Sequence, residues 1–426
     1  MNPVEPIAER QNSGESAWVA RQLDHAKQQA ASEGTPLRAD DVALRTRLRQ
    51  ALGESGMDVL IVFGDDNFTY VTGAALPFAP ETPDRRAVVL QRADGVSVII
   101  CPFDWAEAIR QQGWPGQIDV YDESSASAHD ALGCSLVHVL EALGLGRGRA
   151  GADMARVPLS IEQKLRQALP QLELVPADEQ LGGLRMVKLE SEIALLETAA
   201  LHSEKGLVSA LNHTEGTIDA ISYAVWEFTE RVRVHVGEFG GCATGHVAAM
   251  QGRDASLYFV SPHGVLREGN LVRLEATNMH AGYWSNAART MVVGEPTAAQ
   301  LQAYRDNIWL KAAAVAMLKP GVPCSEVYAA VQRRADEKGI WFWRVAGVGH
   351  GVGTSEREAP YLDASDSTPL APGMVVMVGV YTRGPEDELI VSKDTFAIQP
   401  DGPRLLSWYR NWDRLYAITG STARHG

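Results

Sequence analysis

The sequence has few cysteines, no basic cluster and no long apolar run. Its four cysteines are scattered without a Cys-x-x-Cys pair, which argues against a zinc knuckle and a disulfide framework. The net charge of −14 would repel a phosphate backbone, which argues against nucleic acid as a partner. The longest apolar runs, at 59–63 and 374–378, are strand-sized and too short to cross a bilayer. The chain also begins without the basic and apolar regions of a signal peptide, so we expect a cytoplasmic protein without membrane contact.

The chain is long enough for two domains that each bury a core. Residues 1–37 are polar and are expected to form a tail. Across 38–184, short apolar segments alternate with amphipathic ones, which predicts an α/β domain. Across 185–426, paired strand patterns at 270–276 and 281–293 are joined by a short connection. This pairing predicts a second domain of the antiparallel α+β type.

Six motifs follow one another along the chain. They are residues 58–73, 185–200, the pair 269–276 and 281–290, 318–327, Gly349-His-Gly-Val-Gly353, and 372–376. In this order they resemble the creatinase/prolidase (M24, pita-bread) family, and Arg357-Glu-Ala resembles its creatinase-like, metal-independent branch. The resemblance implies an α/β amino-terminal domain followed by an α+β pita-bread domain. It also implies a homodimer in which the 68–86 loop of one subunit completes the site of the other.

The metal-binding positions of this family are altered in the sequence. In the metal enzymes, carboxylates and one imidazole hold two divalent ions that activate a bridging water. The resemblance assigns the five ligand positions to Glu275, Asn286, His350, Gly379 and Lys393. An amide is a poor ligand, glycine has no side chain, and a lysine cation repels the ion. We therefore predict that no metal and no other cofactor is bound. The alternative is a register shift of one residue, in which Asp394 or the carboxylates of 386–388 supply oxygen.

Two residues are candidates for catalysis. His350 belongs to the side-chain class that transfers protons near neutral pH, and its flanking glycines allow a ligand to approach closely, although a lone histidine is often structural. Glu275 lies on a strand expected to be buried, where an unpaired carboxylate is costly. Two interpretations of Glu275 stay open. It is either a base or nucleophile, or a structural partner of Lys393 that replaces the metal charge.

Further residues are candidates for binding the substrate. Arg357 matches an arginine that contacts the substrate carboxylate in the creatinase branch, and Lys393 could anchor a carboxylate, balance Glu275 or face solvent. The remaining candidates are Asn286, Trp284, Tyr381, His246 and His263. The two histidines lie in 240–265, where the family pattern breaks down, so neither is assigned. The glutamates that grip the guanidinium of creatine correspond to Ala288 and Gly379 here, which argues against creatine.

These observations predict a metal-independent hydrolase, acting as a homodimer. Its substrate would be a small carboxylate-bearing amidine, guanidino compound or amide, cleaved at a non-peptide C–N bond. One alternative is a pita-bread protein that binds a ligand without catalysis. Another is a lyase or biosynthetic enzyme that uses the same pocket.

Overall fold

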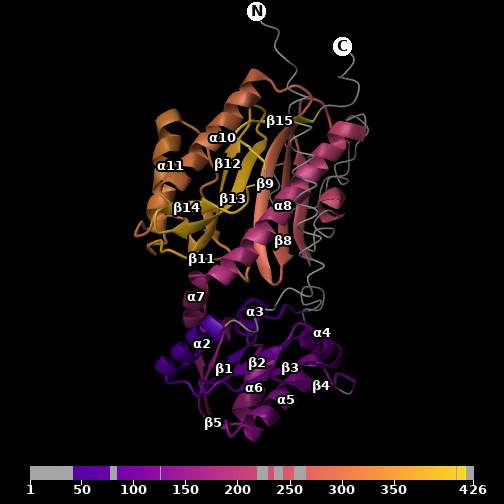
Figure 1. The fold of residues 1–426 in the computed structure, drawn as a ribbon, viewed down its shortest axis with the longest axis vertical. Helices are drawn as coiled ribbons and strands as arrows, with labels where there is room; N and C mark the ends of the chain where they lie inside the picture. Colours follow the sequence, from indigo (N-terminus) through magenta and orange to yellow (C-terminus); the bar gives the residue numbers. More distant parts are fainter. Residues whose placement is uncertain are drawn as a thin grey trace, which may run out of the picture.

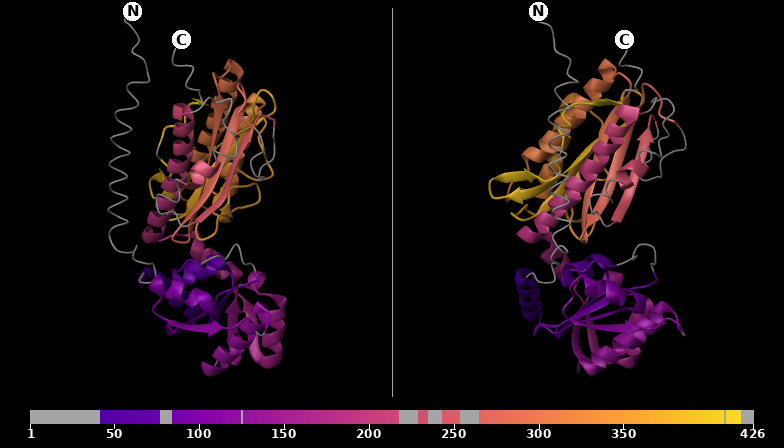
Figure 2. Two further views of the ribbon diagram at one scale, coloured as in Figure 1. Left: turned by 90° about the vertical axis from the view of Figure 1, so that its right-hand side faces the viewer. Right: turned by 45° about the vertical axis from the view of Figure 1, so that its right-hand side comes forward.

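The chain forms two domains that lie one beyond the other along the long axis of the molecule (Figures 1 and 2). A computed structural model describes residues 42–76, 84–124, 126–217, 229–234, 243–253, 265–408 and 410–418. The expected tail at 1–37 lies outside these residues, as does His263. In the described part, no helix is long and apolar enough to span a bilayer.

The amino-terminal domain is a mixed sheet covered by helices on both faces. Its strands are β1 (Val59–Val62), β2 (Val88–Gln91), β3 (Ser97–Pro102), β4 (Gln117–Tyr121), β5 (Arg147–Ala152) and β6 (Gln171–Pro176), in the order β4-β3-β2-β1-β5-β6. Its helices are α2 (Val42–Ser55), α3 (Asp65–Thr72), α4 (Ala106–Gln111), α5 (Ala128–Ala142), α6 (Leu159–Ala168) and α7 (Asp178–Met186). Successive side chains of a strand point to opposite faces. Val59 and Ile61 therefore pack with α5 and α6, while Leu60 and Val62 pack with α2 and α7.

The carboxy-terminal domain is a large, mainly antiparallel sheet. Its strands are β7 (Ala243–Gln251), β8 (Leu271–His280), β9 (Tyr283–Val293), β10 (Gly349–Gly351), β11 (Glu358–Tyr361), β12 (Val375–Arg383), β13 (Leu389–Gln399), β14 (Gly402–Leu405) and β15 (Tyr416–Ile418). The main order is β11-β10-β12-β13-β9-β8-β7. Helix α8 (Glu190–Thr217) packs on β8 and β9, whereas α10 (Ala298–Ala316) packs on β12, β13 and α11 (Cys324–Lys338) (Figure 1). The α/β plus α+β architecture predicted from the sequence is thus present.

Strand alternation decides which side chains the helices cover. On β8, Val272, Leu274 and Ala276 pack in the cluster that includes α8, so Arg273, Glu275 and Thr277 point to the other face. On β12, Val376, Val378 and Val380 pack against α10 and α11, which leaves Met377, Gly379 and Tyr381 on the face away from the helices. The polar residues of interest therefore share the sheet face opposite the helices.

A group of buried ion pairs joins the two domains. Glu358, at the start of β11, pairs with Lys188 at 2.6 Å and with Arg185 at 3.2 Å. Arg185 also pairs with Asp66 of α3 at 2.7 Å. In addition, a Cβ atom at Gly282, which has φ of 81°, would overlap the methyl group of Thr69. Helix α3 is therefore held directly against the carboxy-terminal sheet.

Candidate functional site

An ion pair between Glu275 and Lys393 occupies the middle of the site face. Glu275 on β8 is 3% exposed and Lys393 on β13 is 6% exposed, and the ammonium donates to the carboxylate. The Tyr381 hydroxyl donates to the same carboxylate at 3.1 Å. Burial alone would raise the pKa of Glu275 and lower that of Lys393. Their mutual attraction instead holds the pKa of Glu275 below and that of Lys393 above the usual range.

Gly379 leaves the space that the side chain of Lys393 occupies. The two residues are directly opposite each other on β12 and β13. A Cβ atom at residue 379 would lie 2.5 Å from Cγ of Lys393, which is closer than real carbon atoms approach. The lysine stem therefore uses the space that a side chain at 379 would need.

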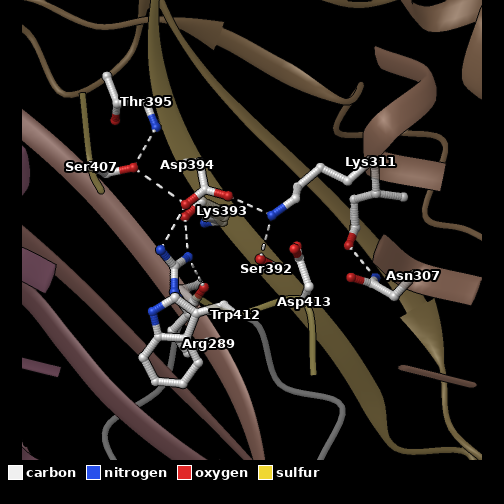
Figure 3. A network of polar contacts seen from close by, with 12 residues as sticks. Arg289, Asn307, Lys311, Ser392, Lys393, Asp394, Thr395, Ser407, Trp412 and Asp413 are labelled. Carbon is white, nitrogen blue, oxygen red and sulfur yellow. Dashed lines mark hydrogen bonds and ion pairs between the residues drawn. The ribbon is translucent and has the colours of Figure 1, made fainter. Parts of the chain in front are cut away.

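Asp394 lies on the opposite, helix-covered face, in the network of Figure 3. Its carboxylate pairs with Arg289 of β9 at 2.6 Å and also with Lys311 of α10. Arg289 in turn pairs with Glu204 of α8 at 2.7 Å. Burial would raise the pKa of Asp394, but the two cations hold it below its usual range. The network anchors β13 to α8 and α10, and this orientation directs Lys393 toward the site face.

His350 lies on β10 and is 5% exposed. Its Nδ1 is 2.9 Å from the carbonyl oxygen of Gly351, so Nδ1 carries the proton and Nε2 is the acceptor. A Cβ atom at Gly349 or Gly351 would overlap a backbone carbonyl of β12 or β11, so these glycines allow the strands to close on His350. Burial lowers the pKa of His350 to about 3, so the imidazole is neutral and weakly basic near pH 7.

Asn286 connects the site face with a loop that follows the histidine motif. Its Nδ2 donates to Oε1 of Glu356 at 3.2 Å, while its Oδ1 is buried and has no hydrogen-bond partner among the described residues. Burial raises the pKa of Glu356, despite the opposing charge of Lys393. Glu356 was not predicted from the sequence. Its place six residues after His350 is the only sequence feature that marks it.

A cavity of about 220 Å³ opens beside Glu356, between the two domains. The residues that line it are Asp65, Asp66, Thr69, Ala75, Leu76 and Arg156 of the amino-terminal domain, and Met279, Gly282, Trp284, Thr354, Ser355 and Glu356 of the carboxy-terminal domain. Trp284 is thus a wall residue, as the sequence suggested it could be. The amino-terminal contribution was not predicted.

The other candidates lie at different depths. Tyr381 is buried against Glu275. His246 is half-buried on β7, where its backbone N–H donates to the hydroxyl oxygen of Thr277 and its carbonyl oxygen accepts from that hydroxyl at 3.1 Å. Arg357 is exposed, and its guanidinium carbon lies 5.4 Å from the ring centre of Tyr361. The structure therefore groups Glu275, Lys393 and Tyr381 and leaves Arg357 at the surface.

Two stacked domains with a polar site on the uncovered face of a curved antiparallel sheet define the creatinase/prolidase class of protein. Residues 45–187 match the model of the creatinase/prolidase N-terminal domain, and residues 194–400 match that of metallopeptidase family M24. The chain belongs to this family.

Several relatives align over most of the chain. An uncharacterised peptidase of Bacillus subtilis is 26% identical, with 85% of this chain and 96% of the relative covered. A probable dipeptidase of Mycobacterium tuberculosis is 25% identical, with 81% and 90% covered. Among solved structures, the Xaa-Pro dipeptidase of Bacillus anthracis has a TM-score of 0.73 at 22% identity, with 88% of this chain and 99% of that chain covered. The last similarity establishes the fold.

These relatives correct the function expected from the sequence. The prediction of a metal-independent hydrolase of non-peptide C–N bonds is wrong, because the named relatives are dipeptidases and Xaa-Pro dipeptidases of a metallopeptidase family. They point to the hydrolysis of peptide bonds. We therefore no longer propose amidines, guanidino compounds or amides as substrates. We also no longer propose a binding protein or a lyase.

The donor atoms at the family's ligand positions nevertheless do not fit a pair of divalent ions. Glu275 is engaged by the Lys393 ammonium, Gly379 has no side chain, and Asn286 directs its amide nitrogen at Glu356. His350 keeps the family's ligand type, with Nε2 as its acceptor atom, whereas the unpartnered Oδ1 of Asn286 is a weak ligand. Within the described ranges, no group of three His, Cys, Asp or Glu side chains is placed to hold a metal. A two-metal centre needs several carboxylate oxygens, so the family's chemistry and this chain's residues differ at the centre of the site.

Proposed function

We propose that the protein binds short peptides in the cavity between its domains and hydrolyses their peptide bond. The observation that carries this proposal is the position of the cavity. It is joined through the Asn286–Glu356 hydrogen bond to the face that holds Glu275, His350 and Lys393. A probable dipeptidase matches 81% of this chain. A homodimer and a cytoplasmic location remain part of the proposal.

Glu356 is the proposed general base. Hydrolysis forms a bond between water oxygen and the carbonyl carbon, breaks the C–N bond and delivers a proton to the departing amine. Glu356 lines the cavity, and burial raises its pKa, which makes its carboxylate a stronger base than an exposed one. In this scheme His350 accepts a hydrogen bond at Nε2, and Glu275 serves as the structural partner of Lys393.

The test is mass spectrometry of the full chain incubated with a panel of dipeptides that includes Ala-Pro, Leu-Pro and Leu-Gly. Parallel samples contain chelator, Mn²⁺, Co²⁺ or Zn²⁺. We expect free amino acids from at least one dipeptide, and a loss of 100-fold or more in Glu356→Gln. Glu179→Gln, which removes an exposed carboxylate at the start of α7, is the matched control and should keep full activity. No product with any dipeptide under any of these conditions would refute the proposal.

The domain limits and the dimer need separate tests. The proposed boundary at 184/185 falls within the last turn of α7, before the interdomain ion pairs. The 68–86 loop proposed to reach the partner lies partly outside the described residues. Light scattering of the purified chain should give twice the chain mass of 46.2 kDa, and a monomeric mass would contradict the dimer.

A further inference from the structure

We propose that a second cavity, in the amino-terminal domain, binds a small aromatic carboxylate. This cavity has a volume of about 170 Å³, and no described residue that lines it also lines the cavity between the domains. Helix α2, the carboxyl end of α3, the turn between β2 and β3 and the segment before β4 form its walls. The inference does not rest on the proposed function, because the described lining residues take no part in the proposed catalytic site.

The charged side chains around this cavity favour an anion. The described residues that line it include two arginines and no aspartate or glutamate. Arg45 and Arg49 lie four residues apart on α2, so their side chains leave the same side of the helix. The whole chain has a net charge of −14, so a lining without acidic residues departs from the composition of the protein. A negatively charged ligand is therefore attracted to this cavity more than to its surroundings.

Arg49 is the residue that we assign to the ligand carboxylate. A Cβ atom at Gly95 would lie 2.6 Å from Nη2 of Arg49, so the guanidinium lies against the bare backbone of the β2–β3 turn. Arg49 is exposed and has no ion-pair or hydrogen-bond partner in the described part of the chain. Asp94, the neighbour of Gly95, pairs with Arg92 at 2.8 Å. The planar guanidinium of Arg49 is thus available to form two parallel hydrogen bonds with a carboxylate.

The interior of the cavity suits an apolar ring. Leu44 and Leu48 of α2 and Val71 of α3 are buried and form one wall. Trp114 forms another, and a Cβ atom at Gly116 would lie 2.8 Å from its ring, so the indole rests directly on that backbone. Aromatic rings pack favourably against an indole, stacked or edge to face. The apolar walls therefore lie inside the cavity, while the guanidinium of Arg49 lies at its exposed rim.

The volume of the cavity limits the size of the ligand. An apolar cavity of roughly 150 Å³ holds benzene, so about 170 Å³ has room for one ring and a short substituent. A long acyl chain or a nucleotide would not fit. An inorganic anion would leave the apolar walls without contact. A single-ring carboxylate, with the ring inside and the carboxylate on Arg49, satisfies both the charge and the size.

The test is calorimetry of the full chain with phenylacetate, phenylacetamide and acetate at pH 7.5. We expect phenylacetate to bind, the neutral amide to bind at least about tenfold more weakly, and acetate, which lacks the ring, to give no measurable heat. Arg49→Gln should weaken phenylacetate binding by about tenfold or more, and Arg49→Lys should weaken it less because the charge remains. Arg147→Gln, which removes an exposed cation of β5 that does not line the cavity, is the matched control and should leave binding unchanged.

Two further variants locate the ligand. Trp114→Leu should weaken phenylacetate binding, whereas Glu356→Gln, in the cavity between the domains, should leave it unchanged. Thermal melts show whether a loss of binding reflects unfolding, and the exposed Arg49 provides a variant that should stay folded. No heat from phenylacetate at 10 mM, equal affinity for the acid and its amide, or binding that Arg49→Gln does not weaken would overturn the proposal.

Discussion

At the scale of single residues, the Glu275–Lys393 pair should behave as a buried ion pair. Lys393→Met would leave the Glu275 carboxylate buried without its cation, so we expect a loss of about 3–5 kcal/mol in the free energy of unfolding. The double variant Glu275→Gln/Lys393→Met removes both charges and should be much more stable than Lys393→Met. Urea unfolding of the single and double variants provides the measurement. Additive losses would show that the two side chains do not interact.

The buried imidazole of His350 predicts a dependence of stability on pH. Its pKa is about 3 in the folded chain and about 6.5 when unfolded, so between these values the unfolded state binds more protons. Stability should therefore fall as pH decreases, by about 3 kcal/mol from this group between pH 7 and pH 4. His350→Gln should flatten the pH profile of urea midpoints over this range. A variant profile parallel to that of the wild-type chain would contradict the assigned burial.

Contacts between neighbouring strands could be predicted from the sequence. Contacts that form only where the two domains pack together could not. The contact between Glu275 and Lys393 was one of two interpretations, because both positions fall on neighbouring strands of a recognisable motif. Glu356 and Asp65 were missed, because they meet at one cavity only after α3 packs against the second sheet. The pattern also cannot distinguish an exposed arginine such as Arg357 from one in a pocket.

At the scale of elements, the fit of β12 against β13 depends on one glycine. Gly379→Ala would place its methyl group 2.5 Å from Cγ of Lys393, so we expect about 1–3 kcal/mol of destabilisation from overpacking. Gly182→Ala is the matched control, because it lies within helix α7 and its methyl group would meet open space. That change should be neutral or stabilise by about 0.5–1 kcal/mol. Equal thermal midpoints for the two variants would count against the packing described for β12.

The strands themselves were predictable because their apolar periods are intact. The strand-sized apolar run at 59–63 is found as β1, and the strand patterns at 270–276 and 281–293 are found as β8 and β9, with first residues that differ by at most two. The polar residues on β8 and β13 do not interrupt the alternating pattern by which a strand is recognised. They alternate with apolar ones that pack under α8, α10 and α11, so the period of two survives.

At the scale of the whole molecule, Glu358 should couple the stabilities of the two domains. Glu358→Ala would leave Lys188 and Arg185 as buried cations without this partner, with an expected cost of about 3–5 kcal/mol. Scanning calorimetry should show the amino-terminal and carboxy-terminal domains melting further apart. Glu326→Ala, which removes an exposed carboxylate of α11, is a suitable control. A single unchanged transition in Glu358→Ala would show that the domains are held by other contacts.

The loop that carries Thr354 and Glu356 leads directly into β11, whose first residue is Glu358. One short segment therefore forms a wall of the cavity between the domains and, through the ion pairs of Glu358, holds that wall against the other domain. The ion pairs of Glu358 therefore contribute to the width of the cavity, together with the residues that line it. Substitution of Arg185 or Lys188 would therefore be expected to change the size of the cavity, although neither side chain lines it.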